Sequence, residues 1–373
     1  MYPSSNKMLS ITGTITLNPK TGRSTIRQVA SAAGVSTQTV SRVINGRPDV
    51  SADTRRRVQT VIDELDFRPS ALARSLISQR SYTLGVVTSG LRHTGPSRTL
   101  SGITESASEA GYALLLEELP RFDMDDPTSI FHALLARHVD GVIWAVPEVG
   151  NNRSWSARLP EGLQLPIVYL TMEPRQNISV VSINNYMGGR LAMAHLIEQG
   201  YRYIGHITGP LDWWEARQRM AAWKDAIQEA GMDACAECWA EGNWSSASGA
   251  AAAKKLFDRF PKIDSIFVGN DQMALGVLSA TPDIGSKAAE RLGIVGFDNI
   301  PESAYFRPAL TTVQQDQFNV GKVAVEEITR MIDSSWQGQE PTEPKSIMLS
   351  PSLIVRSSSR RLQNGEGGET EIK

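Results

Sequence analysis

The sequence is poor in cysteine and in long apolar runs, and each shortage excludes a class of protein. Its 373 residues include two cysteines, Cys235 and Cys238, spaced as C-x-x-C. Neither a second cysteine pair nor a strand-to-helix position accompanies them, so we expect two reduced structural thiols rather than a redox or metal site. A membrane-spanning helix needs about 18 consecutive apolar residues, and no such run occurs. Residues 1–20 also lack the apolar segment of a secretory signal, so a cytoplasmic protein is expected.

The net charge of −2 is small, but the charge is unevenly distributed. Residues 1–82 hold 12 Lys and Arg against 5 Asp and Glu, whereas the rest of the chain holds 26 against 35. A small basic head on a larger acidic body indicates that the head binds a polyanion. The chain is 41% hydrophobic and 21% charged, as in ordinary globular proteins, and its length predicts two or three domains.

The basic head has the N-cap and C-cap residues expected of three short helices. Thr25 with Gln28 three residues later has the spacing of a capping box, and Gly34 is a suitable end for this first helix. Ser36 and Ser51 are suitable N-caps for a second helix, residues 37–45, and for a third. The apolar positions expected to face inward are Ile26, Val29, Ala30 and Ala33, then Val40, Val43 and Ile44, then Val58, Val61, Ile62 and Leu65.

A tight turn between two helices, the second with polar residues near its N-terminus, is typical of a helix-turn-helix that enters the major groove of DNA. Gln38 can pair with adenine and Arg42 with guanine, while Thr37 can contact a base or a phosphate. The expected DNA contacts of this helix are Thr37, Gln38, Ser41, Arg42 and Asn45. The alternative is a small protein-interaction domain, which the basic charge of the head disfavours.

From Thr83 onward short apolar runs alternate with helical segments, which predicts an α/β fold of parallel sheets with helices on both faces. The candidate strands are residues 84–87, 113–116, 141–146, 166–170, 204–207, 265–268 and 293–297. The candidate helices include residues 99–110, 186–199, 215–230, 246–260 and 318–332. So many strands and helices exceed what one sheet of ordinary size holds, so we expect two lobes of doubly wound parallel sheet. Ligands of such folds bind at the carboxyl ends of the strands.

The run TIRQVASAAGVSTQTVSRVINGRPDVSADTRRRV resembles the DNA-binding head of the lactose-repressor (LacI/GalR) family of bacterial transcription regulators. FRPSALARSL, residues 67–76, is similar to the hinge of that family, and the likeness extends to Arg356. The resemblance implies a homodimer whose two hinges fold into helices in the minor groove of the operator. It places Leu76 as an apolar wedge between base steps and Ala73 beside it, a contact that bends the duplex.

The rest of the chain resembles the effector-binding core of the family, which is similar to periplasmic sugar-binding proteins. The resemblance lies in the runs TSGLRHTGPSRTL, GPLDWWEARQRMAAW, EGNWSSASG, VGNDQMALG, VGFDNIPES and LTTVQQD. It implies that Arg219 contacts the effector, with Asn270 and Asp298 as polar partners and Trp244 as an aromatic wall. Such a set suits a sugar. The complete set of expected effector contacts is Ser89, His93, Trp213, Arg219, Trp244, Asn270, Asp298 and Gln315.

The sequence leaves one choice in this set open, and positions outside the set depart from lactose-type members. One of the adjacent Trp213 and Trp214 is expected to face the cleft, whereas Trp223 is expected in the core. Lactose-type members have an acid where Thr171 stands, for which Glu173 is a nearby substitute, and an amide where Ala145 stands. Lactose-type chains also end in a leucine heptad that makes tetramers, which the polar residues 362–373 lack, so a dimer is expected.

The sequence therefore predicts a homodimeric repressor that binds a near-palindromic operator and is released by a sugar or glycoside, with no cofactor, metal or catalytic site. Two alternatives stay open: a regulator that needs a purine-type corepressor, and a soluble sugar receptor or enzyme on the same fold. The expected segments are a disordered leader (1–23), a helix-turn-helix domain (24–68), a hinge (69–82), a two-lobed core (83–361) and a disordered tail (362–373). We expect the repressor to lie on the nucleoid.

Overall fold

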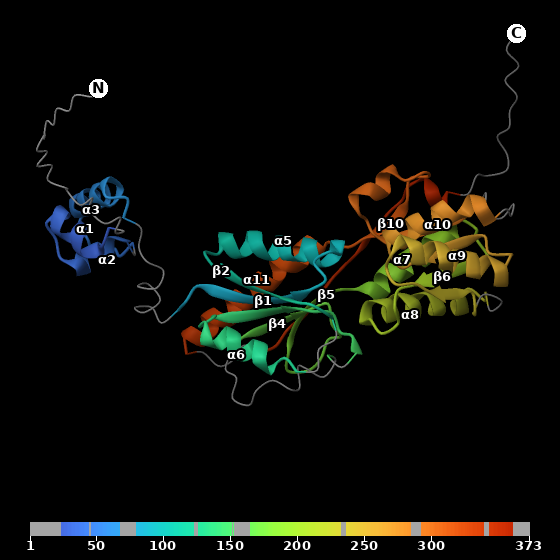
Figure 1. Ribbon diagram of the computed structural model, residues 1–373, viewed down its shortest axis with the longest axis horizontal. Helices are drawn as coiled ribbons and strands as arrows, with labels where there is room; N and C mark the ends of the chain where they lie inside the picture. Colours follow the sequence, from blue (N-terminus) through green and yellow to red (C-terminus); the bar gives the residue numbers. More distant parts are fainter. Residues whose placement is uncertain are drawn as a thin grey trace, which may run out of the picture. The chain divides into compact units, whose positions relative to one another are not determined.

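The computed structural model describes residues 24–44, 46–67, 80–122, 126–150, 152, 165–232, 236–284, 292–338 and 343–360. The chain divides into two compact units, Met1–Ser81 and Tyr82–Lys373 (Figure 1). Several sequence predictions lie outside the described residues, namely those for the leader, for the tail, for most of the hinge and for Asn45, Ala73 and Leu76. No helix in the described ranges is both long and apolar enough to cross a membrane.

The described part of the first unit folds into the three expected helices, α1 (Ile26–Ala33), α2 (Thr37–Ile44) and α3 (Ala52–Glu64). The capping box at the start of α1 is confirmed, because Thr25 and Gln28 each bond the other's backbone amide. Ser36 and Ser51 accept hydrogen bonds from the amides of the third residues after them, at 3.1 and 3.3 Å. Gly34 ends α1 with a φ of 64°, a left-handed conformation that glycine adopts without strain.

One position of the predicted apolar stripe is wrong. Leu65 follows the last turn of α3 and is 36% exposed, whereas Phe67, two residues later, is buried. The helix ends at Glu64, so the 3.6-residue periodicity no longer applies beyond it and the chain turns Phe67 inward instead. The other predicted inward positions lie in or against the small core of this unit.

The first lobe of the second unit is a six-stranded sheet in the order β11-β5-β4-β3-β1-β2. Its strands are β1 (Thr83–Ser89), β2 (Ala113–Leu119), β3 (Gly141–Ala145), β4 (Ile167–Leu170), β5 (Ser179–Ile183) and β11 (Ser346–Leu349), and all pair in parallel. Helices α5 (Thr94–Glu109) and α11 (Gln317–Trp336) lie together on one face, and α6 (Thr128–Ala136) lies on the other (Figure 1). Neighbouring residues of β1 therefore enter different cores, Val86 that of α5 and α11 and Val87 that of α6.

The second lobe is a six-stranded sheet in the order β12-β10-β9-β8-β6-β7, in which β12 alone pairs antiparallel. Its strands are β6 (Ile204–Thr208), β7 (Trp239–Glu241), β8 (Ser265–Val268), β9 (Gly293–Asp298), β10 (Thr311–Gln314) and β12 (Ser352–Ile354). Its helices are α7 (Asn185–Glu198), α8 (Trp214–Glu229), α9 (Ser246–Arg259) and α10 (Asp271–Ile284), with short 3-10 helices at Pro301–Tyr305 and Ser357–Ser359. Together they enclose a core in which Trp223 is fully buried, as expected.

The chain passes between the two lobes at three places. β5 of the first lobe leads into α7 of the second, β10 of the second leads into α11 of the first, and β11 of the first leads into β12 of the second. Gln315 lies on the middle crossing, directly after β10 and before α11. These crossings lie beside the carboxyl ends of the strands, where open α/β sheets bind ligands.

Candidate ligand cavity and nucleic-acid interface

A cavity of about 710 Å³ lies between the two lobes of the second unit. Its walls come from the start of α5, the ends of β3, β4, β8 and β9, the start of α8, the loop before α9 and the crossing after β10. Seven of the eight residues predicted to bind an effector line it: His93, Trp213, Arg219, Trp244, Asn270, Asp298 and Gln315. The eighth, Ser89, is the last residue of β1 and is 1% exposed, so it lies behind the wall.

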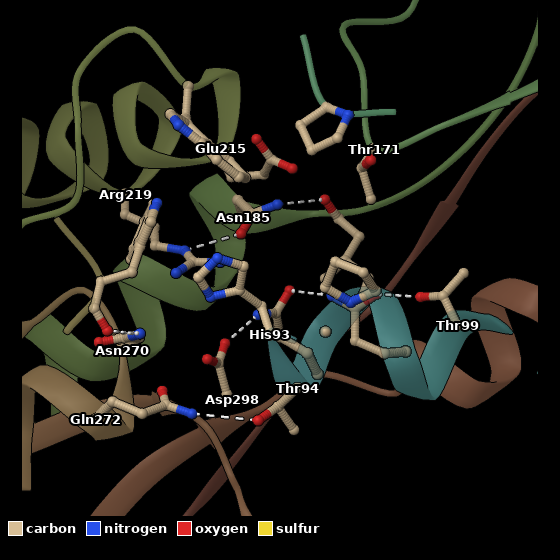
Figure 2. A pocket seen from close by; sticks show the side chains of 18 of the residues that line it. His93, Thr94, Thr99, Thr171, Asn185, Glu215, Arg219, Asn270, Gln272 and Asp298 are labelled. Atoms are coloured by element: carbon tan, nitrogen blue, oxygen red, sulfur yellow. Dashed lines mark hydrogen bonds between the residues drawn. The ribbon is translucent and has the colours of Figure 1, made fainter. Parts of the chain in front are cut away.

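Arg219 is the central cation of this cavity and is 5% exposed (Figure 2). Its Nε donates to Asn185 Oδ1 at 2.9 Å and its Nη1 donates to the carbonyl of Gly269. The guanidinium also lies 3.8 Å from the centroid of the Phe297 ring and 5.5 Å from that of Trp244. Three parts of the second lobe, namely α7, the residue that follows β8, and β9, thus hold the fork in one orientation, so it is preorganised for a ligand.

Asp298 lies at the end of β9 with a φ of 111°, an uncommon conformation for a residue other than glycine. Gln315 Nε2 donates to its Oδ1 at 2.5 Å, and Gln315 in turn accepts from Gln317 at 3.1 Å. Burial raises the pKa of Asp298 to about 6, although Arg219 and the bond from Gln315 act in the opposite direction. The carboxylate is held in place by a backbone distortion and one amide, as is common at ligand-binding positions.

Two indoles form an aromatic wall beside the polar groups. Trp213 and Trp244 meet edge to face with their centroids 5.8 Å apart, and Trp213 packs in the same way on Phe122 at 4.9 Å. The choice between the adjacent tryptophans is settled, because Trp213 lines the cavity and Trp214 is buried elsewhere. Gly209 lies beneath Trp244, where a Cβ would come within 2.1 Å of the indole.

Asn270 explains how Trp244 keeps its unusual backbone conformation, a φ of 70°. The Asn270 amide donates to the carbonyl of Trp244 at 3.1 Å, while its oxygen accepts from the amide of Met273 at 2.9 Å and begins α10. Trp244 Nε1 is buried and has no hydrogen-bond partner among the described residues. An acceptor supplied by a ligand would satisfy this donor.

Sequence analysis missed Glu215, a carboxylate that lines the cavity and is 9% exposed (Figure 2). It lies four residues before Arg219 on α8, and residues at this spacing share one helix face, so the position of Arg219 was a usable indicator. Burial raises the pKa of Glu215 to about 7, with Arg219 and Arg217 opposing the shift. Other lining residues absent from the prediction are Thr94, Thr99, Asn185, Asn243, Gln272 and Gln317.

Thr171 and Ala145 line the cavity at the ends of β4 and β3, so the two departures from lactose-type members do fall in its wall. Thr171 has a φ of 54° and donates its hydroxyl to the preceding carbonyl. Glu173, the suggested substitute acid, is exposed and lies outside the wall. The carboxylates that line the cavity are instead those of Glu215 and Asp298, both from the second lobe.

Direct hydrogen bonds join the two lobes. Gln272 of α10 donates to Thr94 Oγ1 at 3.2 Å, and Asp212 accepts from the amide of Gly150 at 2.7 Å. His93, the N-cap residue of α5, lies against Phe122 with centroids 6.1 Å apart, and burial lowers its pKa. The relative position of the lobes is therefore linked to polar groups that also line or border the cavity.

In the first unit, α2 presents the predicted DNA-contacting side chains. Thr37, Gln38 and Arg42 are exposed and Ser41 is half-buried, on the side opposite Val40 and Val43. Arg42 lies 3.4 Å from Asp49 in an ion pair of two half-exposed side chains. Such a pair contributes about 1 kcal/mol or less, so a guanine or phosphate can displace Asp49 readily.

The arginines of α3 in this unit have different roles. Arg55 donates to the carbonyls of Arg47 at 2.5 Å and of Val43 at 3.5 Å, so it ties α3 to the end of α2. Arg56 pairs with Asp53 at 2.6 Å on the exposed side of α3, as a surface charge does. In the residues that the structure describes, no cluster of three His, Cys, Asp or Glu is placed to hold a metal ion.

Comparisons with known proteins agree with both parts of this description. Residues 25–70 match the family of bacterial regulatory proteins, lacI family, and residues 193–359 match the periplasmic binding protein-like domain. The chain is 31% identical to the HTH-type transcriptional repressor PurR of Aliivibrio salmonicida, over 91% of this chain and 99% of that protein. It is 31% identical to the lactose operon repressor of Escherichia coli, over 82% and 84% respectively.

Solved structures with the same fold include a lac repressor dimer bound to operator and the anti-inducer ONPF, with a TM-score of 0.77 and 29% identity over 91% of this chain and 99% of that chain. A complex of the transcriptional regulator CelR with cellobiose has a TM-score of 0.63 and 30% identity, over 90% of this chain and all of that chain. Both similarities extend through the head and the two-lobed core. The chain belongs to the lacI family of bacterial regulatory proteins.

Proposed function

We propose that this protein is a dimeric transcription repressor that binds a near-palindromic operator and is released from it by a sugar or glycoside. The observation that carries the effector half of the proposal is a cavity between two lobes in which a buried, fixed arginine, two carboxylates and two indoles converge. Carboxylates and a guanidinium fork suit hydroxyl groups, and indoles suit the apolar face of a pyranose ring. Relatives that act on sugar operons or bind cellobiose support the same class.

The DNA half of the proposal assigns roles to side chains on α2. Gln38 and Arg42 would contact base edges, while Thr37, Ser41 and Asn45 would contact bases or phosphates. Each good bidentate base contact provides roughly 1–3 kcal/mol of discrimination. Leu76, with Ala73 beside it, would enter the central minor groove as the wedge that bends the operator.

Coupling between the two halves requires that the effector prefer one arrangement of the lobes. Lining residues come from both lobes: Thr94 and Thr171 from the first, and Arg219 and Asp298 from the second. A ligand that bonds both sets gains contacts only at one lobe separation, which is the differential affinity that allostery needs. Rotation of the first lobes in the dimer would then separate the hinges and lower the affinity for the operator.

The test measures operator binding and effector binding on the same full-length protein. An operator selected from random DNA is titrated by fluorescence anisotropy, alone and with galactose, glucose, ribose, lactose, cellobiose, guanine or hypoxanthine. The proposal predicts that a sugar stabilises the protein in a thermal-shift assay and weakens operator binding. A nucleobase that strengthens operator binding would establish the corepressor alternative instead.

We also propose that the protein has no catalytic activity and acts in the cytoplasm on the nucleoid, where its operator lies. The relatives are transcription regulators rather than enzymes, which supports the first point. Prolonged incubation with each stabilising sugar, followed by chromatography, is expected to return the sugar unchanged. Turnover of a bound sugar would favour an enzyme on this fold.

A further inference from the structure

Glu215 is a buried carboxylate whose hydrogen bonding is incomplete. It is 9% exposed, and its Oε2 atom has no hydrogen-bond partner among the described residues. None of the salt bridges found in the described ranges includes it. Its place in the first turn of α8 favours a carboxylate through the helix dipole, but an unsatisfied buried acceptor is destabilising, more so when it is charged, and Oε2 still lacks a donor.

Glu215 faces the cavity rather than the core. It lines the cavity together with Thr171, and Figure 2 shows its carboxyl group directed toward the side of the site on which Thr171 lies. Thr171 belongs to the first lobe and Glu215 to the second. The unsatisfied oxygen therefore borders the space in which a ligand would bridge the two lobes.

The charge of the cavity wall is unfavourable to anions. Its charged groups away from bulk solvent are two carboxyls, the buried Glu215 and the half-buried Asp298, and one buried guanidinium, Arg219. Arg219 uses two of its five N–H donors on Asn185 and a backbone carbonyl, so it can still donate to a ligand, but its single positive charge faces two carboxyls. Arg92, also in the wall, is exposed to solvent and its charge is screened there. A phosphate or carboxylate on a ligand would lie in low dielectric beside two acids.

We propose that Glu215 determines the class of effector: it accepts hydroxyl donors of an uncharged sugar and excludes phosphorylated and carboxylated sugars. This inference rests on the proposed function and narrows it, because a sugar site could equally well be built for a sugar phosphate or a sugar acid. An uncharged polyol supplies the O–H donor that Oε2 lacks, and it introduces no charge beside Asp298. The indoles of Trp213 and Trp244 remain available to its ring faces.

The experiment compares sugars of matched shape and different charge on the full chain. Glucose, galactose, cellobiose and lactose are compared with glucose 6-phosphate, glucuronate and galacturonate by titration calorimetry at pH 8, where Glu215 is largely ionised. The same titrations are repeated on Glu215→Gln, which keeps the shape and removes the charge. Glu229→Gln is the matched control, since Glu229 lies on the same helix, pairs with Arg190 at the surface and does not line the cavity.

The wild type is expected to bind at least one neutral sugar and to bind every anionic counterpart at least tenfold more weakly. Glu215→Gln should lose at least tenfold in affinity for that neutral sugar and should reduce the discrimination against its anionic counterpart, while Glu229→Gln changes neither. A preference of the wild type for an anionic sugar overturns the inference, and so does a Glu215→Gln affinity within twofold of the wild type. Both of those results leave the proposed function standing if the sugar still releases the operator. Binding of no sugar at all removes the proposed function and the inference with it.

Discussion

Replacing Glu215 by glutamine is expected to stabilise the protein above neutral pH, although the residue lines the binding cavity. Burial raises the pKa of the Glu215 carboxyl from 4.5 to about 7 in the folded protein. Between these two values the unfolded chain is ionised at this position and the native state is not, so the native state binds more protons. The neutral carboxyl therefore makes its full contribution to the free energy of unfolding below about pH 4.5, and this contribution is lost as the pH rises through about 7.

The size of the effect follows from the shift. One pKa unit corresponds to about 1.4 kcal/mol, so ionised Glu215 costs the folded protein roughly 3 kcal/mol above pH 8. A glutamine avoids this cost, but its buried amide has no partner, which destabilises the folded protein by about 1 kcal/mol. Glu215→Gln should then be more stable than the wild type by roughly 2 kcal/mol at pH 8.5 and slightly less stable at pH 5. At roughly 2–4 °C per kcal/mol for a core of this size, the rise in Tm at pH 8.5 is about 4–8 °C.

The assay is thermal and urea unfolding of both proteins from pH 5 to 8.5 without ligand. The other acids with raised pKa values, Asp271 at about 8 and Asp298 at about 6, are present in both proteins, so the difference between the curves isolates position 215. Arg217, Arg219, Arg92 and His93 also surround the site and are unchanged in the variant. A difference that does not change sign or magnitude with pH would refute the reasoning.

Glu229→Gln is the control for this prediction and should behave in the opposite way. A side-chain hydrogen bond from Arg190 lowers the pKa of Glu229 below its ordinary value. The stability that this pair contributes is present above pH 4.5 and is lost on acidification, so Glu229→Gln should be the less stable protein at pH 8.5.

Four further predictions address the site, the packing and the hinge. Arg219→Ala should abolish the response of operator binding to the effector, measured by anisotropy, because no other buried cation lines the described cavity; a retained response would contradict its role. Gly209→Ala should weaken effector binding at least tenfold by calorimetry, since its methyl group would lie 2.1 Å from the Trp244 indole. Gly321→Ala should lower stability by roughly 1–3 kcal/mol in urea unfolding, because a Cβ there would lie 2.2 Å from a backbone oxygen of α5; an unchanged midpoint would show that α11 shifts freely. Leu76→Ala should weaken operator binding and reduce DNA bending in a gel assay, and unchanged bending would contradict the wedge.

The alternation of short apolar runs with helices was enough to predict two parallel-sheet lobes, but several edge elements were missed. β11 alternates between exposed and half-buried residues over only four positions, and β12 has only three residues, one exposed and two half-buried, so neither stands out as a pattern. β5 was missed for another reason: its sequence SVVSI has a serine at each of two positions, although all five residues are buried. The Ser182 hydroxyl is satisfied by the backbone of Met172, a partner that the sequence does not reveal.

The candidate site shows the same division between local and long-range information. Asn270 and Asp298, which the resemblance to the family had singled out, do line the cavity, and both follow strands at the sheet edge where topology predicts a ligand. Ser89 does not reach the cavity wall, since β1 continues through it and its side chain is buried; the lining residues of this loop begin at Arg92. Glu215 required knowledge of which face of α8 borders the cavity, and the position of Arg219 was the local indication of it.

The incomplete bonding of Glu215 also bears on how a ligand can alter DNA binding. An unsatisfied acceptor contributes more to stability when a ligand donor is held against it, so it can favour the arrangement of the lobes that binds the ligand. Glu215 and Arg219 lie on one lobe, and Thr94 and Thr171 lie on the other, so a ligand bonded to both sets favours one lobe separation. A hydrogen bond from the ligand also favours the ionised form of Glu215 and lowers its pKa, so effector affinity should rise with pH between about 6 and 8. The destabilising carboxylate would then be the group through which the protein distinguishes the bound state from the free one.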